Sequence, residues 1–329
     1  MPMYTLGADI GGTKCAVILG RGELPRGDAG DFIIDKRAFP TRTGDGWQSV
    51  VDEILSEADE LLAKNGISPK ELVGIGISCG GPLDSTRGVI LSPPNLPGWD
   101  AVPITEMFEK HFGIRAYLRN DANACALAEW RFGAARGSKN AVFLTFGTGM
   151  GAGLILDGRL YSGTNDMAGE VGHIRLAADG PEGYGKKGSF EGFCSGGGIA
   201  RLAKHMAEKA FAQGRTSSLF ACEKDIHNIT AKSVALAADG GDALAGEIYD
   251  ICAEKLGTGL SVLIDVLNPE IIVIGSIYAR NEARFLPKIT KIIEAEALPL
   301  SASVCRVLPA ALGENIGDFA ALSAAFEGE

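Results

Sequence analysis

The sequence has no long hydrophobic run, no cluster of basic residues and no closely paired cysteines. Its apolar stretches are only strand-sized, and the first residues lack a basic segment followed by an apolar one, so we expect neither a membrane span nor a secretion signal. Lys and Arg number 31 against 41 Asp and Glu, and the resulting net charge of −10 disfavours a nucleic-acid or anionic-membrane surface. These absences favour a cytoplasmic protein.

The seven cysteines are scattered, and none belongs to a Cys-x-x-Cys pair. Most of them lie in apolar runs, which is typical of reduced thiols in a core rather than of disulfides. With 329 residues, 46% of them hydrophobic, the chain can bury a large core and form about two domains.

The spacing of apolar residues predicts a mixture of helices and strands. From 47 to 64 these residues recur at intervals of three and four, which predicts an amphipathic helix that stops at Gly66. Short apolar runs predict strands at 3–8, 15–19, 72–78, 114–118, 141–146, 154–156 and 271–274. Further helices are predicted at 103–112, 120–130, 199–212, 233–238 and 242–267, and one that begins with Pro287. The alternation predicts an α/β fold.

A glycine turn lies between the first two predicted strands, in Asp9-Ile10-Gly11-Gly12-Thr13-Lys14. Two adjacent glycines let backbone N–H groups approach phosphate oxygens, Thr13 can add a hydroxyl donor, and Asp9 can hold Mg²⁺ through water. Gly-Gly is also a common hairpin turn, so these six residues alone leave both interpretations open.

A second glycine turn, Gly147-Thr148-Gly149, also ends a hydrophobic strand and leads into another. The pair of turns is the pattern of a duplicated domain whose halves each present backbone donors to a nucleotide. The stretch from Gly147 to Ala152 formally fits the dinucleotide fingerprint, but a strand rather than a helix follows it. The chain also lacks a P-loop and a Gly-x-Ser-x-Gly elbow, which disfavours a P-loop enzyme and an α/β-hydrolase.

Asp121 is the strongest candidate for a catalytic residue. It follows Arg119-Asn120 at the end of a predicted strand and opens a helix. A carboxylate in the first turn of a helix is often only a cap that stabilises it by about 1 kcal/mol. At the junction of two halves, however, it can accept a proton from a substrate hydroxyl while the glycine turns hold a phosphate.

Five motifs resemble those of the ROK family (repressors, open reading frames and sugar kinases), in the same order. They are Asp9-Ile10-Gly11-Gly12-Thr13-Lys14, Pro94-Asn95-Leu96-Pro97-Gly98-Trp99, Asn120-Asp121-Ala122-Asn123, Gly147-Thr148-Gly149-x-Gly151 and Gly169-Glu170-Val171-Gly172-His173. The resemblance covers nearly the whole chain. The family's repressors carry a winged-helix segment ahead of the first motif, where this chain has eight residues, so we expect a kinase.

The resemblance implies the two-lobed sugar kinase/actin-like ATPase fold, built from duplicated ribonuclease H-like domains. A small lobe would comprise residues 1 to about 119 plus about 311–329, and a large lobe residues 120–310. The implied activity is ATP-dependent, Mg²⁺-assisted phosphorylation of a hexose 6-hydroxyl by a homodimer. Glucose is the first expectation; N-acetylglucosamine or N-acetylmannosamine, another acceptor, or sugar binding without catalysis are the alternatives.

The resemblance also implies residue roles. Asn95, Asn120 and Asp121 would hold the sugar's 3-, 4- and 6-hydroxyls, with Asp121 as the general base. Glu170, His173 and Glu191 would read the anomeric side, and Gly81 would line the same pocket. The nucleotide-binding residues would be Asp9, Gly11, Gly12, Thr13, Lys14, Thr148, Gly149 and Gly275. For His173 the alternative is a buried core histidine.

The chain departs from the family at its zinc site. The family pattern joins the histidine of Gly-His to three cysteines in Cys-x-Cys-Gly-x-x-Gly-Cys-x-Glu, and residues 182–191 here contain no cysteine. Glu182, Tyr184 and Ser189 cannot supply the thiolates of a closed zinc site. We therefore expect no structural zinc, and one of these three side chains to orient the His173 ring instead.

Overall fold

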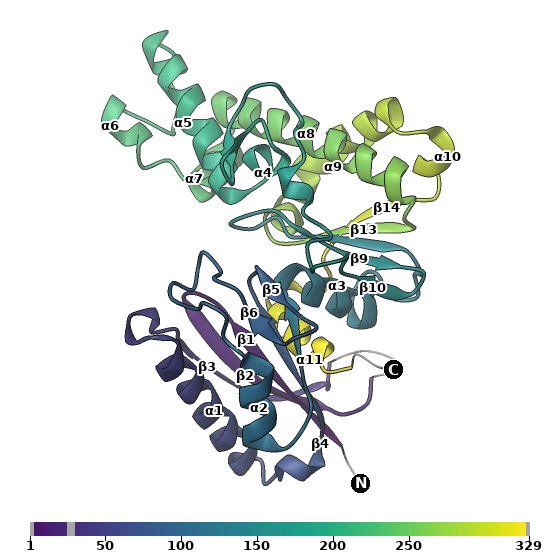
Figure 1. Cartoon of the computed structure of the whole chain (residues 1–329). Helices are drawn as coiled ribbons and strands as arrows, with labels where there is room; N and C mark the ends of the chain where they lie inside the picture. Colours follow the sequence, from purple (N-terminus) through teal and green to yellow (C-terminus); the bar gives the residue numbers. More distant parts are fainter. Residues whose placement is uncertain (1–2, 25–29, 327–329) are drawn as a thin grey trace. The chain divides into compact units, whose positions relative to one another are not determined.

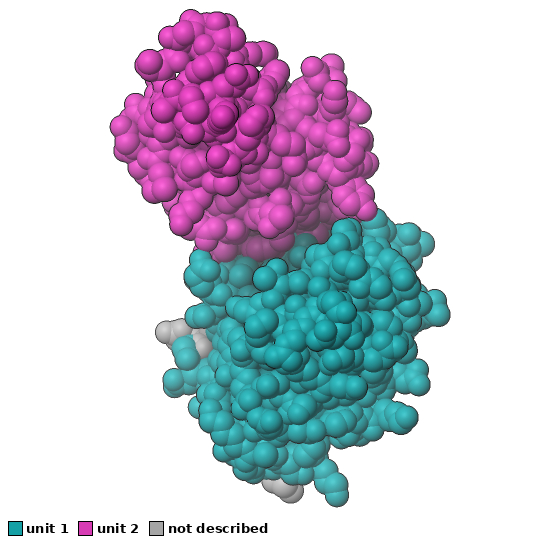
Figure 2. Space-filling view, turned by 90° about the vertical axis from the view of Figure 1, so that its left-hand side faces the viewer, with its two compact units in different colours: residues 1–139, 153–168, 311–329 teal, residues 140–152, 169–310 magenta. Residues whose placement is uncertain are grey.

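The computed structural model describes residues 3–24 and 30–326 (Figure 1). The chain divides into two compact units, coloured teal and magenta in Figure 2: unit 1 comprises residues 1–139, 153–168 and 311–329, and unit 2 comprises 140–152 and 169–310. The small lobe expected at 1 to about 119 and 311–329 includes residues 1–2, 25–29 and 327–329, which lie outside the described residues. Both expected lobe boundaries stay predictions.

The first sheet has the strand order β3-β2-β1-β4-β7. Its strands are β1 (Tyr4–Ile10), β2 (Lys14–Arg21), β3 (Ile33–Pro40), β4 (Leu72–Cys79) and β7 (Ala116–Asn120). The β1–β2 and β2–β3 pairs are antiparallel, so the first glycine motif is the tip of a hairpin, as predicted. In the parallel part, Ile10 pairs with Cys79 and Cys79 with Asn120. The carboxyl ends of β1, β4 and β7 therefore share one edge.

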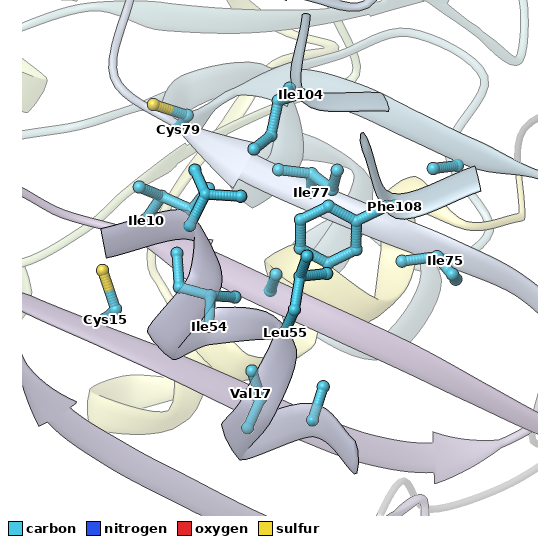
Figure 3. Close-up of a cluster of buried hydrophobic side chains, with 14 of the residues drawn as sticks. Ile10, Cys15, Val17, Ile54, Leu55, Ile75, Ile77, Cys79, Ile104 and Phe108 are labelled. Atoms are coloured by element: carbon cyan, nitrogen blue, oxygen red, sulfur yellow. The ribbon is translucent and has the colours of Figure 1, made fainter. Parts of the chain in front are cut away.

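Helices cover both faces of this sheet. On one face, α1 (Trp47–Lys64) and α2 (Ile104–Phe112) pack against the strands, and Figure 3 shows Ile54 and Phe108 in that core with Ile77 of β4. The amphipathic spacing thus predicted α1 correctly. On the other face, α3 (Asp121–Phe132) and α11 (Ile316–Ala324) form a core with Phe32. A short hairpin, β5 (Leu83–Asp84) and β6 (Val89–Ile90), follows β4.

The second sheet repeats the first. Its order is β10-β9-β8-β13-β14, with β8 (Ala141–Leu144), β9 (Ala152–Leu156), β10 (Arg159–Tyr161), β13 (Ile271–Ile274) and β14 (Arg306–Pro309). β8, β13 and β14 are parallel, like β1, β4 and β7, and β9 pairs antiparallel with β10, like β2 with β3. The repeated order confirms the predicted duplication, in which each half contains one glycine turn.

Unit 2 contains the remaining helices and a hairpin. The helices are α4 (Phe190–Phe193), α5 (Gly196–Ala212), α6 (Glu223–Ile226), α7 (Ala231–Asp239), α8 (Ala243–Leu267), α9 (Ile277–Glu296) and α10 (Pro299–Ala302). The hairpin consists of β11 (Glu182–Gly183) and β12 (Lys186–Lys187). Asp242 caps α8 by accepting a hydrogen bond from Ala245 N at 3.0 Å, where the sequence predicts the helix to start.

The prediction that a helix begins at Pro287 is wrong. α9 starts ten residues earlier, at Ile277, and Pro287 lies in its interior. Proline favours the first helical turn, but here tertiary packing extends the helix towards its N-terminus. Tyr278 and Phe285 are fully buried, and the Phe285 ring packs against the Phe146 ring with 5.7 Å between their centroids. The only backbone departure inside α9 is at Asn281.

None of the described helices is both long and apolar enough to cross a membrane. All seven cysteines are free thiols, and Cys15, Cys79, Cys194 and Cys252 are buried. Cys125 and Cys305 are half-buried, and Cys222 is exposed.

Candidate functional site

Three predicted site residues lie at the shared edge of β1, β4 and β7. Asp9 is the penultimate residue of β1, Asn120 ends β7, and Asp121 opens α3. The cap of α3 is Asn120, whose Oδ1 accepts a hydrogen bond from Asn123 N at 2.7 Å. The Asp121 carboxylate accepts from local backbone N–H groups, its own and that of Ala122, the latter at 2.8 Å. The capping interpretation therefore belongs to Asn120, and Asp121 is available for another role.

The carboxylates at this edge are electrostatically unusual. Burial, and then the nearby Asp318 and Asp121 carboxylates, raise the pKa of Asp9 to about 7. Asp121 is exposed, yet desolvation by the residues around it also raises its pKa. A carboxyl group with a raised pKa is a stronger base in its ionised form, which suits proton abstraction from a hydroxyl near neutral pH.

Two residues near Asp9, Lys36 and Asp318, were not identified from the sequence. Lys36 Nζ on β3 lies 2.5 Å from Asp318 Oδ1 on α11. The first turn of α11 approaches Asp9 so closely that a Cβ on Gly317 would lie 3.1 Å from Asp9 Oδ2. Lys36 lowers the pKa of Asp9 while Asp318 raises it. The adjacent Gly317 and Asp318 in an otherwise apolar helix were the available sequence signal.

The first glycine turn is held from one side by Thr41. Thr41 Oγ1 donates to the Gly11 carbonyl at 2.6 Å, and Thr41 N donates to the Thr13 carbonyl at 2.9 Å. The Gly11 N–H bonds to Lys14 O at 3.1 Å within the hairpin. Because the Gly11 N–H is already bonded within the hairpin, the N–H groups of Gly12 and Thr13 are better candidates than Gly11 for binding a phosphate. Thr13 and Lys14 are exposed.

Asn95 packs directly against this turn. A Cβ on Gly12 would lie 3.0 Å from Asn95 Cβ and closer still to the Asn95 carbonyl oxygen. On its other side, a Cβ on Gly80 would lie 3.2 Å from Asn95 Oδ1. Asn95 therefore lies between Gly12 and Gly80, so one predicted sugar-binding residue adjoins the predicted phosphate turn.

The second glycine turn, residues 147–151 in unit 2, is also well braced. Thr145 N donates to Gly151 O at 3.0 Å, and Gly151 N donates to Thr145 Oγ1 at 2.8 Å. Gly196 N, at the start of α5, donates to Gly147 O at 2.7 Å. Thr148 is exposed at the tip. Gly275 follows β13 and donates to Leu144 O at 3.0 Å, which places it at the end of the adjacent strand β8.

Glu170 and His173 lie on one tight turn, as their spacing predicts. Val171–His173 forms a single 3₁₀ turn, and Glu170 and His173 are both exposed. His173 is therefore not a buried core histidine. The Tyr184 ring stands edge-on to the His173 ring, with 6.4 Å between centroids, and Lys186 Nζ donates to the His173 carbonyl at 2.7 Å.

The donors near His173 do not fit the zinc ion that the family resemblance implies. Ser189 is fully buried, and its hydroxyl accepts a hydrogen bond from Gly192 N at 3.1 Å and donates to Gly183 O at 3.4 Å. Tyr184 offers a neutral phenol. Within the described part of the chain, no three His, Cys, Asp or Glu side chains are placed to hold a metal ion. The expected lack of zinc stays a prediction.

Glu191 lies on α4 and contacts the second glycine turn. Its Oε2 accepts a hydrogen bond from Met150 N at 3.1 Å. A Cβ on Gly149 would lie 2.9 Å from the same oxygen. The structure therefore brings a predicted sugar-binding carboxylate onto the predicted phosphate turn, which the sequence did not indicate.

A cavity of about 420 Å³ lies elsewhere in unit 2, between α9, α10 and β14. Leu286, Ile289, Pro299 and Val307 are among its lining residues, and none of the predicted site residues is.

Comparison with known proteins agrees with the motif order. The model of the ROK family matches residues 5–325. The chain belongs to the ROK family. A glucokinase of Halalkalibacterium halodurans is 35% identical over 319 residues, which cover 95% of this chain and 92% of that protein. A xylose repressor of Caldicellulosiruptor bescii is 29% identical over 88% of this chain and 69% of its own length.

Among solved structures, the chain is similar to a ROK family glucokinase from Streptomyces griseus in complex with glucose and AMPPNP. The two share 28% identity and a TM-score of 0.74, over 99% of this chain and all of the other. ROK membership thus extends to relatives described as enzymes and to relatives described as repressors.

Proposed function

We propose that this ROK protein is an ATP-dependent hexose kinase that transfers the γ-phosphoryl group to a sugar 6-hydroxyl, with glucose as its substrate. The proposal rests mainly on the position of Asp121. This carboxylate has a raised pKa and lies at the same strand edge as Asp9, and Asn120 rather than Asp121 caps the helix. The glucokinase relatives support the choice of glucose.

In this proposal each group of residues has a distinct task. Asp121 accepts the proton of the 6-hydroxyl as that oxygen attacks, while Asn120 and Asn95 orient the sugar beside Gly81. Glu170, His173 and Glu191 bind the anomeric side. Phosphoryl transfer demands mainly positioning and charge stabilisation, so these hydrogen bonds contribute by fixing the acceptor oxygen in line.

The nucleotide phosphates would contact the two glycine turns, through the backbone of Gly12, Thr13, Thr148 and Gly149, with Lys14, Gly11 and Gly275 nearby. Asp9 would hold the Mg²⁺ that accompanies ATP, and this ion would neutralise charge on the transferring phosphoryl group. The fit is electrostatic, because Asp9 is desolvated by burial and lies near the Asp318 and Asp121 carboxylates, which together raise its pKa. A cation there favours its ionised form.

The second candidate is a sugar-binding protein without catalysis, since the Caldicellulosiruptor bescii xylose repressor aligns with 88% of this chain. The two candidates differ in one measurable property. A kinase releases ADP in the presence of its acceptor, whereas a sensor binds the sugar and releases none.

The test is a coupled ADP-release assay with glucose, N-acetylglucosamine and N-acetylmannosamine, followed by identification of the phosphorylated position. We expect glucose to give the highest kcat/KM and a 6-phosphate product. A protein that binds glucose without ADP release would be a sensor, and preference for an N-acetylhexosamine would overturn only the substrate. Size-exclusion chromatography with light scattering tests the expected homodimer.

A further inference from the structure

Glu191 has a fixed backbone position. Ser189 caps α4, and the preceding Phe190 is fully buried. Cys194 N donates to Phe190 O at 2.8 Å and closes the single helical turn. A residue anchored in this way can move its carboxylate only by side-chain rotation, so the ligands of that carboxylate determine where it points.

The backbone of the second glycine turn supplies one of these ligands. Met150 N donates to Glu191 Oε2 at 3.1 Å, and the same oxygen would lie 2.9 Å from a Cβ on Gly149, so a side chain there would displace the carboxylate. A hydrogen bond to a charged acceptor is stronger than one between neutral groups. The carboxylate therefore helps to set the conformation of the turn that we assign to the nucleotide phosphates.

The other predicted sugar-reading residues approach the same place. A Cβ on Gly172 would lie 3.2 Å from Glu191 Cβ and would collide with the Met150 carbonyl oxygen. Ala152 N donates to the Gly169 carbonyl at 2.8 Å. The segment 169–173, which carries Glu170 and His173, is thus packed against both Glu191 and the strand that leaves the glycine turn.

We propose that Glu191 couples the two substrates: the carboxylate that receives a sugar hydroxyl also holds the glycine turn, so each substrate raises the affinity for the other. This inference rests on the proposed kinase function. A sugar hydroxyl bonded to Glu191 restricts rotation of its side chain and keeps Oε2 on Met150 N. The turn is then already ordered when the nucleotide binds, so nucleotide binding loses less conformational entropy. Linkage makes the effect reciprocal.

The experiment is calorimetric titration of Mg·AMPPNP into the full-length protein, with and without saturating glucose, for wild type, Glu191→Ala and His173→Ala. For wild type we expect glucose to tighten nucleotide binding by about tenfold, within the usual range of coupling between sites. We call the nucleotide Kd without glucose divided by the Kd with glucose the coupling ratio. For Glu191→Ala we expect this ratio to be near one. His173→Ala is the matched control, because it loses a sugar contact on the same turn but leaves the Met150–Glu191 bond, so at saturating glucose its ratio stays at the wild-type value.

Glu191→Gln gives a second measurement if the alanine variant folds poorly. Its amide oxygen still accepts from Met150 N, so we expect an intermediate ratio. In parallel, amide hydrogen exchange of the peptide that contains Met150 is expected to slow when glucose binds wild type, but not Glu191→Ala.

The outcomes separate this inference from the proposed function. Wild type that binds glucose and nucleotide with no mutual effect overturns the coupling and leaves the kinase assignment intact. A wild-type ratio in Glu191→Ala also overturns it. Wild type that binds no hexose overturns both proposals.

Discussion

Lys36 and Asp318 form an ion pair, with 2.5 Å between Nζ and Oδ1, that joins the edge strand β3 to the C-terminal helix α11. Asp318 is almost completely buried, whereas about a third of the Lys36 side chain is exposed. The pair lies beside Asp9, and its two members have opposite effects there: Lys36 lowers the pKa of Asp9 and Asp318 raises it.

Lys36→Met should destabilise the protein, because it leaves the buried Asp318 carboxylate without its cation. Loss of one partner from a fully buried pair costs about 3 to 5 kcal/mol, and we expect about 1 to 2 kcal/mol here since Lys36 reaches solvent. Urea unfolding at pH 7 measures the loss. The double variant Lys36→Met/Asp318→Asn is the control: it should recover much of the stability, and an additive loss would contradict the account.

Asp9→Asn should become progressively more stable than wild type as the pH rises. Because the pKa of Asp9 is raised to about 7 in the folded protein, the folded state holds this proton more tightly than the unfolded state. The contribution is fully present below about pH 4 and is lost as the pH rises through 7. Asparagine does not titrate, so the difference in unfolding free energy should grow over that window, by about 1.4 kcal/mol per unit of pKa shift.

The measurement is urea unfolding of both proteins at pH 5 and pH 8 without magnesium. Asp52→Asn, which removes an exposed carboxylate on α1, is the matched control for the loss of one acidic side chain. A constant difference between wild type and Asp9→Asn would show that Asp9 titrates normally.

Asp121→Asn should abolish phosphorylation while sugar binding and folding persist. The amide keeps the shape of the carboxylate but cannot accept the hydroxyl proton, and loss of a general base costs about 10² to 10⁴ in rate. Turnover is measured by ADP release and glucose binding by calorimetry. Unchanged turnover would remove Asp121 from the catalytic role.

His173→Ala should weaken use of the sugar by about tenfold to a hundredfold, because a polar group of the substrate loses its partner. The KM for ATP should hardly change. Steady-state kinetics with each substrate varied in turn supplies both constants. A variant impaired mainly toward ATP would show that His173 has no part in reading the acceptor.

The purified protein should contain no stoichiometric zinc. The Ser189 hydroxyl is already engaged inside α4, and Tyr184 presents only a neutral ring beside His173. A chelator should therefore leave the melting temperature unchanged, since loss of a structural zinc site would remove many kcal/mol of folding free energy. Elemental analysis that finds one zinc per chain would refute this expectation.

The sequence predicted those features that depend on local pattern. The apolar spacing located α1 to the residue, and the glycine turns were placed at the ends of the correct strands. It did not locate β3. Burial alternates along this strand, but Asp35 and Arg37 occupy two of the half-buried inward positions and obscure the apolar signal. Pro287 misled because burial of Phe285 outweighed the positional preference of proline.

In the candidate site, the motifs named the residues but not their contacts. Glu191 and Met150 are 41 positions apart, and Lys36 and Asp318 are 282 apart. Such pairs depend on how strands and helices are stacked, and no local pattern encodes that. The sequence predicted that Asn120-Asp121 caps the helix that follows, and in the structure Asn120 supplies the cap, as expected for the residue before the first helical turn.

The repeated strand order has a consequence for which residues the two glycine turns can accept. At the first turn the backbone of Asn95 packs against Gly12. At the second turn the carboxylate of Glu191 packs against Gly149 and accepts a hydrogen bond from Met150 N. The backbone of Asn95 leaves no space for a side chain on Gly12, whereas a side chain on Gly149 would require the flexible Glu191 carboxylate to move. Under the proposed function, a substitution at Gly12 therefore displaces the segment that orients the sugar, whereas a substitution at Gly149 displaces a single carboxylate.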